Sequence, residues 1–98
     1  MINLLGKKVI VRGDRSGVFF GTLVAKESRE VELNNCRRLW YWDGAASISQ
    51  IAVDGVSKPS RCKFTVSVDS ILIEDVIEII PCTEKAISVI EGVNLWKI

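Results

Sequence analysis

Residues Val18 to Ala25 read Val-Phe-Phe-Gly-Thr-Leu-Val-Ala, and this stretch decides the fold. Its β-branched and aromatic residues predict a strand that begins after the turn-forming residues 13–17. Gly21 inside this strand indicates a bend, a bulge or a close approach of another backbone. Because residues 7–11 also have the composition of a strand, the sheet is expected to begin with a hairpin.

Residues 30–34 predict a third strand, in which Val31 and Leu33 alternate with glutamates. This strand is expected to continue, or to bulge at residues 34–35, into the aromatic segment that ends at Trp42. Three twisted strands with short turns favour a small barrel or a curled sheet.

Two short helices are predicted after these strands. Residues 43–55 place Ile48, Ile51 and Ala52 at helical spacing, with Asp43 as the expected N-cap and Gly55 as the end. Residues 84–92 form the second predicted helix, introduced by Pro81 and Thr83.

The segment between the helices predicts further strands. Residues 63–69 alternate strictly, so Phe64, Val66 and Val68 are expected on one face. Residues 71–80 are apolar on both faces, which predicts a strand that is central to the sheet or at an interface. We expect this strand to break or kink near residues 74–75.

The tail, residues 93–98, alternates and is expected to add an edge strand or to dock on a neighbouring molecule. The predicted fold class is therefore α+β, with a small curved antiparallel sheet or partial barrel and two short helices. A single domain is expected over residues 1–98.

The composition narrows the class of protein. The 98 residues are 48% hydrophobic and 26% charged, with a net charge of +1, which is typical of a globular domain. The charge gives no global field that would attract DNA or an anionic membrane. So short a chain buries only roughly two-thirds of its surface on folding, so we expect a homo-oligomer.

The absence of histidine removes the commonest general base and metal ligand, so His-based triads and most zinc sites are excluded. The acidic groups at residues 30–32 and 74–78 fit exposed strand positions. Cys36 is expected to be a buried structural thiol. We therefore expect no enzyme activity, no metal and no cofactor.

The three cysteines, an odd number without paired spacing, are typical of a reducing cytosol. The N-terminal residues lack a basic region before their short apolar stretch, and no later apolar run is long enough to span a membrane. The expected localisation is cytoplasmic.

Residues 37–47 hold most of the functional information. In an extended strand Leu39 and Tyr41 share the core face, whereas Arg38, Trp40 and Trp42 share the other face. That second face can meet a helix of the same fold, a second subunit or a ligand, because Trp and Arg are enriched at interfaces and also hold nucleotides.

Two segments are candidate anion sites. Gly44 to Ser47 opens the first predicted helix, where free amides favour a phosphate unless Asp43 caps them. The turn that contains Arg12 and Arg15 can present amides and guanidinium groups, or can be a hairpin turn with solvated charges. Arg61 and Lys63 form a weaker basic pair, which fits a solvated strand edge.

The first strands, residues 9–11, 16–24 and 31–35, resemble the Sm-like pattern of a strand, a strand with an internal glycine, and a strand that ends in Asn. Sm-like proteins form rings that bind RNA, which implies an alternative function as a single-stranded RNA-binding module. The resemblance covers about a third of the chain, and the helix that precedes the Sm-like strands is missing here.

A second resemblance rests on residues 37–52, 62–66 and 76–83. This chain is similar to the small phage-encoded anti-Thoeris sponges, which sequester cyclic ADP-ribose signals. The resemblance implies a non-enzymatic homo-oligomer in the host cytosol that binds a cyclic nucleotide between subunits. A structural or assembly protein of a phage, with the tryptophans buried between subunits, is the other alternative.

A cyclic nucleotide offers base faces for stacking, a pyrophosphate for ion pairs and a ribose for hydrogen bonds. The expected ligand-binding residues are Arg12, Arg15, Phe20, Asn34, Asn35, Arg37, Arg38, Trp40, Trp42, Ser47 and Gln50.

Overall fold

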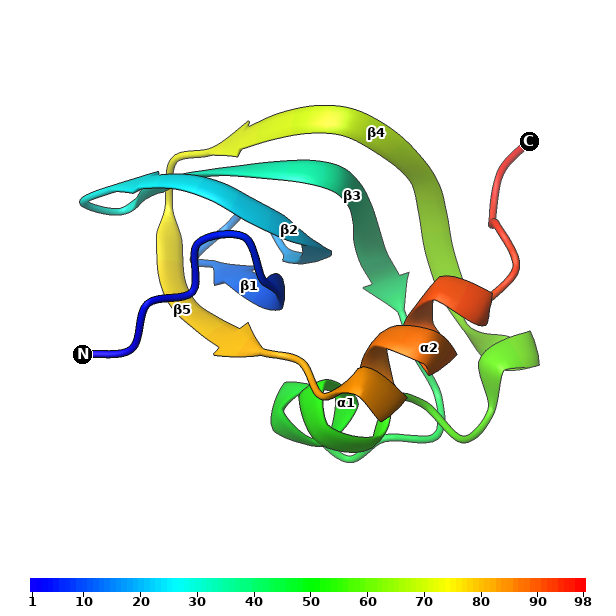
Figure 1. Ribbon diagram of the computed structural model, residues 1–98. Coiled ribbons are helices and arrows are strands. Elements are labelled where there is room, and N and C mark those ends of the chain that lie inside the picture. Colours follow the sequence, from blue (N-terminus) through cyan, green and yellow to red (C-terminus); the bar gives the residue numbers. More distant parts are fainter.

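The sheet of this protein is antiparallel and strongly curled, with the open strand order β4-β3-β2-β1-β5 (Figure 1). A computed structural model describes the whole chain, residues 1–98. The elements are β1 (Lys8–Gly13), β2 (Val18–Glu27), β3 (Glu30–Tyr41), α1 (Ile48–Asp54), the 3-10 helix η1 (Pro59–Arg61), β4 (Lys63–Ile73), β5 (Val76–Pro81) and α2 (Glu84–Gly92). The predicted α+β class, with a partial barrel and two short helices, is confirmed. Neither helix is long and apolar enough to cross a membrane.

The curl of the sheet depends on Gly21 in β2. A Cβ atom at Gly21 would lie 3.0 Å from the carbonyl oxygen of Asn34 and 3.2 Å from Cα of Cys36. The pairing of β2 with β3 shifts register at this point, and Asn35 has a positive φ of 50°. Of the bend, bulge or close approach predicted at Gly21, the structure shows an irregular pairing and a close approach, because a side chain there would push the two strands apart.

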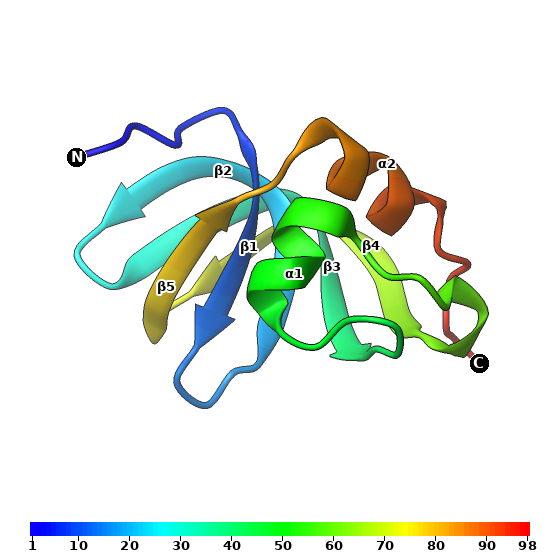
Figure 2. The same cartoon turned by 90° about the horizontal axis from the view of Figure 1, so that it is seen from below.

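Both faces of the sheet are covered, so alternate residues of one strand lie in different cores. In β2, Phe20 belongs to a core between the sheet and the two helices, together with Leu39, Phe64 and Ile90. The preceding residue, Phe19, belongs to a second core inside the curl. Figure 2 shows α1 and α2 together on one face of the sheet, and this is the face that carries Phe20. We call these the helix-side core and the inner core.

The expectation that Phe64, Val66 and Val68 share one face is wrong. Phe64 is fully buried in the helix-side core, whereas Val66 and Val68 are exposed. The β3–β4 pairing shifts register between Arg37 and Leu39, so three residues of β4 span two residues of β3. This irregularity turns the later side chains of β4 to the other face.

The apolar segment 71–80 does break at residues 74–75, as predicted, but it is not central to the sheet. Its first part, residues 71–73, is the end of β4, and its second part, residues 76–80, is most of β5. These two strands are the edges of the sheet. Ile73 and Val76 are buried because the curl encloses the inner core even at its edges. The segment therefore resembles a central strand in composition.

The first helix begins later than predicted. Its N-cap is Ser47 and not Asp43, since the Ser47 hydroxyl accepts a hydrogen bond from the Gln50 amide at 3.2 Å. The predicted end at Gly55 is confirmed by its φ of 79°. The second helix has the predicted range, with Thr83 as N-cap.

Asp75 links the two turns that lie at one end of the sheet. Its carboxylate accepts hydrogen bonds from the Arg15 amide at 2.8 Å, from the Ser16 amide at 2.9 Å and from the Ser16 hydroxyl. These bonds, the Ser16 hydroxyl first, lower the pKa of Asp75 below its ordinary value of 3.8.

Because the pKa of Asp75 is lower in the folded state, its contribution to stability is full above about pH 4 and is lost as pH falls through the folded pKa. We expect Asp75→Asn to lower Tm at pH 7, and we expect the difference from the unmodified protein to shrink below pH 4. Thermal unfolding from pH 2 to pH 7 measures this. An equal Tm difference at all pH values would show that the charge of Asp75 does not matter.

Candidate functional site

Three aromatic side chains gather at the end of β3. The indoles of Trp40 and Trp96 are stacked, with ring centroids 6.3 Å apart and an interplanar angle of 14°. Trp40 is 63% exposed, Tyr41 50% and Trp96 44%. Exposed aromatic rings in this arrangement are typical of a surface that stacks bases or binds a partner.

A lysine lies beside these rings. Lys63 Nζ is 5.4 Å from the ring centroid of Trp96 and 5.9 Å from that of Tyr41. Lys63 forms no salt bridge, unlike nearby Arg61, whose guanidinium lies 3.4 Å from the Asp43 carboxylate. We define Trp40, Tyr41, Lys63 and Trp96 as the aromatic cluster.

Three separate segments build the aromatic cluster. Trp40 and Tyr41 are the last residues of β3, and Tyr41 pairs with Lys63 at the start of β4. Trp96 comes from the tail, which runs from α2 past the start of β4 (Figure 2). Its amide donates a hydrogen bond of 2.9 Å to the carbonyl oxygen of Phe64.

The predicted division of the Arg38–Trp42 segment is only partly correct. Leu39 is buried in the helix-side core, as expected. Tyr41 is half exposed instead of buried, and Trp42 packs against the helix-side core instead of sharing a face with Trp40. The register shifts again between Leu39 and Tyr41, which ends the regular alternation.

Arg37 has no free surface for a ligand. Its side chain is buried, and its guanidinium donates hydrogen bonds to the carbonyl oxygens of Thr65 and Ile90, both at 2.9 Å, of Phe64 at 3.1 Å and of Asn94 at 3.4 Å. Burial lowers the pKa of Arg37. The prediction that Arg37 pairs with a ligand phosphate is corrected: it bonds the backbone instead.

Phe20, Ser47 and Gln50 also have structural roles in place of the expected ligand contacts. Phe20 is buried in the helix-side core. The Gln50 side chain accepts a hydrogen bond of 2.7 Å from the Ala46 amide, while Ser47 caps Gln50. Hydrogen bonds within the chain therefore occupy the Ala46 and Gln50 amides, so the Ala46 amide is not free for an anion as the prediction at residues 44–47 required.

The turn at residues 13–17 is not an open anion site either. Its amides at residues 15 and 16 already bind the Asp75 carboxylate. Arg12 lies on the adjoining strand, 3.6 Å from the Glu78 carboxylate, and the Arg15 side chain is exposed. An anion of the protein itself thus occupies the place predicted for a phosphate.

The remaining predicted residues lie in or beside the curl of the sheet. The Arg38 guanidinium is 4.5 Å from the ring centroid of Phe19 and donates a hydrogen bond of 2.7 Å to the Ser16 carbonyl oxygen. Asn35 is exposed at the irregularity opposite Gly21, and Asn34 is half-buried. Of the residues predicted as ligand contacts, only Trp40 belongs to the aromatic cluster.

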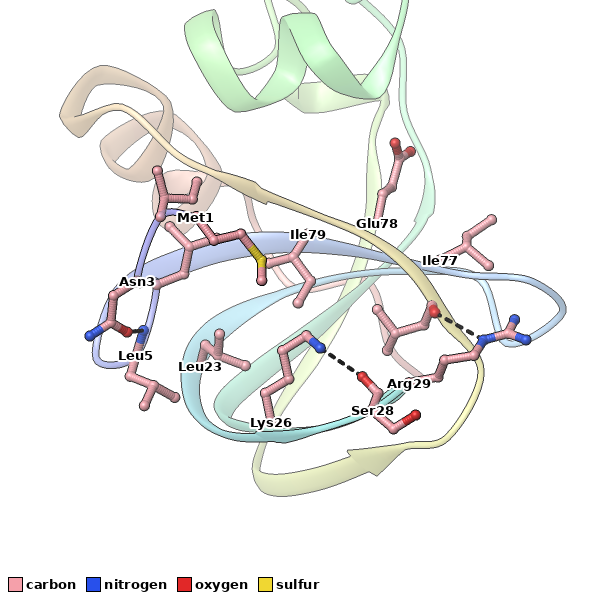
Figure 3. Close-up of a pocket in the computed structure, with 13 residues that line it drawn as sticks. Met1, Asn3, Leu5, Leu23, Lys26, Ser28, Arg29, Ile77, Glu78 and Ile79 are labelled. Atoms are coloured by element: carbon pink, nitrogen blue, oxygen red, sulfur yellow. Dashed lines mark hydrogen bonds between the residues drawn. The ribbon is translucent and has the colours of Figure 1, made fainter.

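The sequence did not predict a groove that lies away from the aromatic cluster. A groove of about 590 Å³ runs between residues 1–5, the β2–β3 hairpin and β5 (Figure 3). Its walls are mostly apolar, and Lys26 and Arg29 stand at the hairpin side. None of the predicted ligand contacts lies in this groove.

Cys36 and Cys82 are not activated as nucleophiles in this structure. Cys36 is buried, as expected, and burial raises the pKa of Cys36 and of Cys82 to about 11. At neutral pH both are thiols, whereas nucleophilic attack requires the thiolate. Across the whole chain, no group of three or more His, Cys, Asp or Glu side chains is arranged to hold a metal ion.

Sequence reasoning missed Tyr41, Lys63 and Trp96 as members of a site, and it placed Tyr41 on the core face. The alternation of the tail predicted an edge strand or docking on a neighbouring molecule, whereas the tail forms only an isolated bridge between Leu95 and Phe64 of the same chain. The stacking of Trp40 on Trp96 could not be predicted, because 56 positions separate them in the sequence. Lys63 carried only the general signal of a basic residue at a strand edge.

The chain matches no curated protein and no solved structure. A sequence profile described as a domain of unknown function, DUF6948, matches residues 6–90. The match runs from the start of the sheet into α2, and it includes Trp40, Tyr41 and Lys63. This protein therefore belongs to the DUF6948 family of domains of unknown function.

Proposed function

We propose that this protein is a non-enzymatic binding protein that sequesters a cyclic nucleotide of the cyclic ADP-ribose type. The observation that supports this proposal is the aromatic cluster, in which near-parallel exposed indoles stand beside a lysine without a carboxylate partner. The indole faces provide stacking surfaces for a base. Lys63 provides a positive charge for a phosphate group.

The net charge of the chain suits a small ligand better than a long polyanion. A total of 13 basic and 12 acidic residues gives no field that would collect nucleic acid over a long range. A single pyrophosphate needs only local cations, and Lys63 is one. The resemblance to anti-Thoeris sponges supports the same ligand class and a role in the host cytosol as a phage anti-defence protein.

One subunit leaves the aromatic cluster open, which implies a second copy. A tight small-molecule site encloses about 70–90% of its ligand, whereas Trp40 and Tyr41 are at least half exposed here. Sub-micromolar binding corresponds to about −8 kcal/mol or better and needs such enclosure. We therefore place the complete pocket between subunits of a homo-oligomer.

The test is retention of an intact ligand. Purified protein is incubated with cyclic ADP-ribose, freed of unbound ligand by gel filtration and then heated, and the released small molecules are analysed by mass spectrometry. We expect release of cyclic ADP-ribose with unchanged mass, near one molecule per site. A cleaved product would identify an enzyme, and absence of retained ligand would refute the sequestering function.

Single-stranded RNA is a second candidate ligand, because Trp40, Tyr41 and Trp96 are all exposed, and exposed aromatic rings can stack on bases of any sequence. Binding of oligoadenylates of increasing length separates the two functions. RNA binding predicts an affinity that rises with length and falls steeply with salt. Cyclic ADP-ribose binding predicts neither.

A further inference from the structure

The tail of the protein carries one wall of the aromatic cluster and is lightly attached. Leu95 forms a single parallel bridge with Phe64, and the Trp96 amide bonds the Phe64 carbonyl oxygen. Leu95, Trp96 and the residues after them are exposed and belong to neither core. Trp40, by contrast, lies within β3, between Leu39 and Tyr41, which both pair with β4.

Arg37 joins this tail to the sheet. Its Nη2 donates to the carbonyl oxygens of both Phe64 and Asn94, and its Nη1 donates to that of Ile90 near the end of α2. The Phe64 carbonyl oxygen thus accepts bonds from Arg37 and from the Trp96 amide. The position of Trp96 therefore depends on a buried guanidinium that does not touch the aromatic cluster's surface.

We infer that residues 94–98, which follow the buried Val93, form a movable wall of the ligand site and that Arg37 is the positioning residue of this wall. The inference rests on the proposed function, since it concerns the same aromatic cluster. A flat ring that contacts both Trp40 and Trp96 can do so only while the tail is docked on β4, because docking holds the two indoles side by side. By linkage, such a ligand stabilises the docked tail, and loss of docking lowers the affinity of the protein for the ligand.

Hydrogen exchange of the Trp96 amide tests the wall directly in the unmodified protein. This amide exchanges only when its bond to Phe64 opens. We expect saturating cyclic ADP-ribose to slow its exchange by about tenfold or more, with no similar change at exposed hairpin residues such as Ser28. Unchanged hydrogen exchange of the Trp96 amide at saturating cyclic ADP-ribose would overturn the inference that the tail is a wall of the site, while leaving the proposed function intact. A protein that binds no nucleotide would overturn both.

A double-mutant cycle tests the role of Arg37. We expect Trp96→Ala and Arg37→Gln each to weaken cyclic ADP-ribose binding by about fivefold or more, from the lost stacking. In the Trp96→Ala background, Arg37→Gln should have no further effect on affinity, although it should still lower Tm. A merely structural Arg37 would give independent effects, and that result would overturn its positioning role.

Two further variants keep this cycle decisive. Arg61→Gln removes an exposed arginine near the cluster and should leave affinity unchanged. If Arg37→Gln does not fold, Arg37→Lys retains the charge with fewer donors in fixed geometry. Arg37→Lys should speed hydrogen exchange of the Trp96 amide and weaken the binding of cyclic ADP-ribose. Faster exchange with unchanged affinity would overturn the inference.

Discussion

Replacing Phe64 by alanine should lower the free energy of unfolding by about 3–5 kcal/mol. Phe64 is fully buried in the helix-side core, and the Arg37 guanidinium lies 5.6 Å from its ring centroid. The substitution leaves a cavity between the sheet and the helices, and it removes a cation–π contact. In a chain of this length, such a loss lowers Tm by more than about 10 °C. Urea unfolding followed by circular dichroism measures the free energy.

Leu72→Ala is the matched control for Phe64→Ala, because it removes a large apolar side chain from the same strand. Leu72 is exposed, so its substitution should change stability by less than about 0.5 kcal/mol. Similar losses in the two variants would contradict the assignment of Phe64 to a core and the register of β4 described here.

The elements that sequence analysis predicted well are those fixed by local chemistry. The strand at residues 18–25 required a glycine at one position, because another backbone approaches it within contact distance. The second helix has a threonine cap and helical spacing within its own nine residues. The contacts that fix the helix lie within the helix itself. The contact that fixes the strand comes from another backbone, but only glycine permits it, so the residue type indicates it.

The errors in the strands share one physical origin, which is that the sheet curls and has a core on each face. Where two cores flank one sheet, buried side chains occur on both faces, and strict alternation no longer identifies one buried face. Because of irregularities in the β3–β4 pairing, Phe64 is buried in the helix-side core, whereas Val66 is exposed. A shift of one residue reverses the faces of a strand, and the sequence does not mark where it occurs.

The predicted site was limited by the same geometry. Arginines adjacent in sequence have different surroundings: Arg37 faces α2 and bonds carbonyl oxygens, whereas Arg38 faces Phe19. Composition shows that arginine is present but not which carbonyl oxygens surround it. The pairing of Trp40 with Trp96 depends on how the tail returns to β4, which is a long-range feature.

Replacing Trp40 by alanine should weaken cyclic ADP-ribose binding by about 5- to 150-fold, the equivalent of about 1–3 kcal/mol for one stacked base. Trp40 is 63% exposed, so the variant should fold with a Tm close to that of the unmodified protein. Trp40→Phe should retain part of the affinity, because a smaller aromatic face remains. Isothermal titration calorimetry with cyclic ADP-ribose measures the three affinities.

Ile77→Ala is the control for Trp40→Ala, since Ile77 is an exposed apolar residue on β5 outside the aromatic cluster. Its affinity for cyclic ADP-ribose should be unchanged. Sedimentation of each variant separates the functional alternatives, because Trp40 can contact a ligand, a second copy or both. If Trp40→Ala dissociates the oligomer without changing the affinity of each subunit, the indole is an assembly contact. Unchanged affinity would then place the ligand elsewhere, because a base stacked on Trp40 loses its contact area whether or not subunits remain associated.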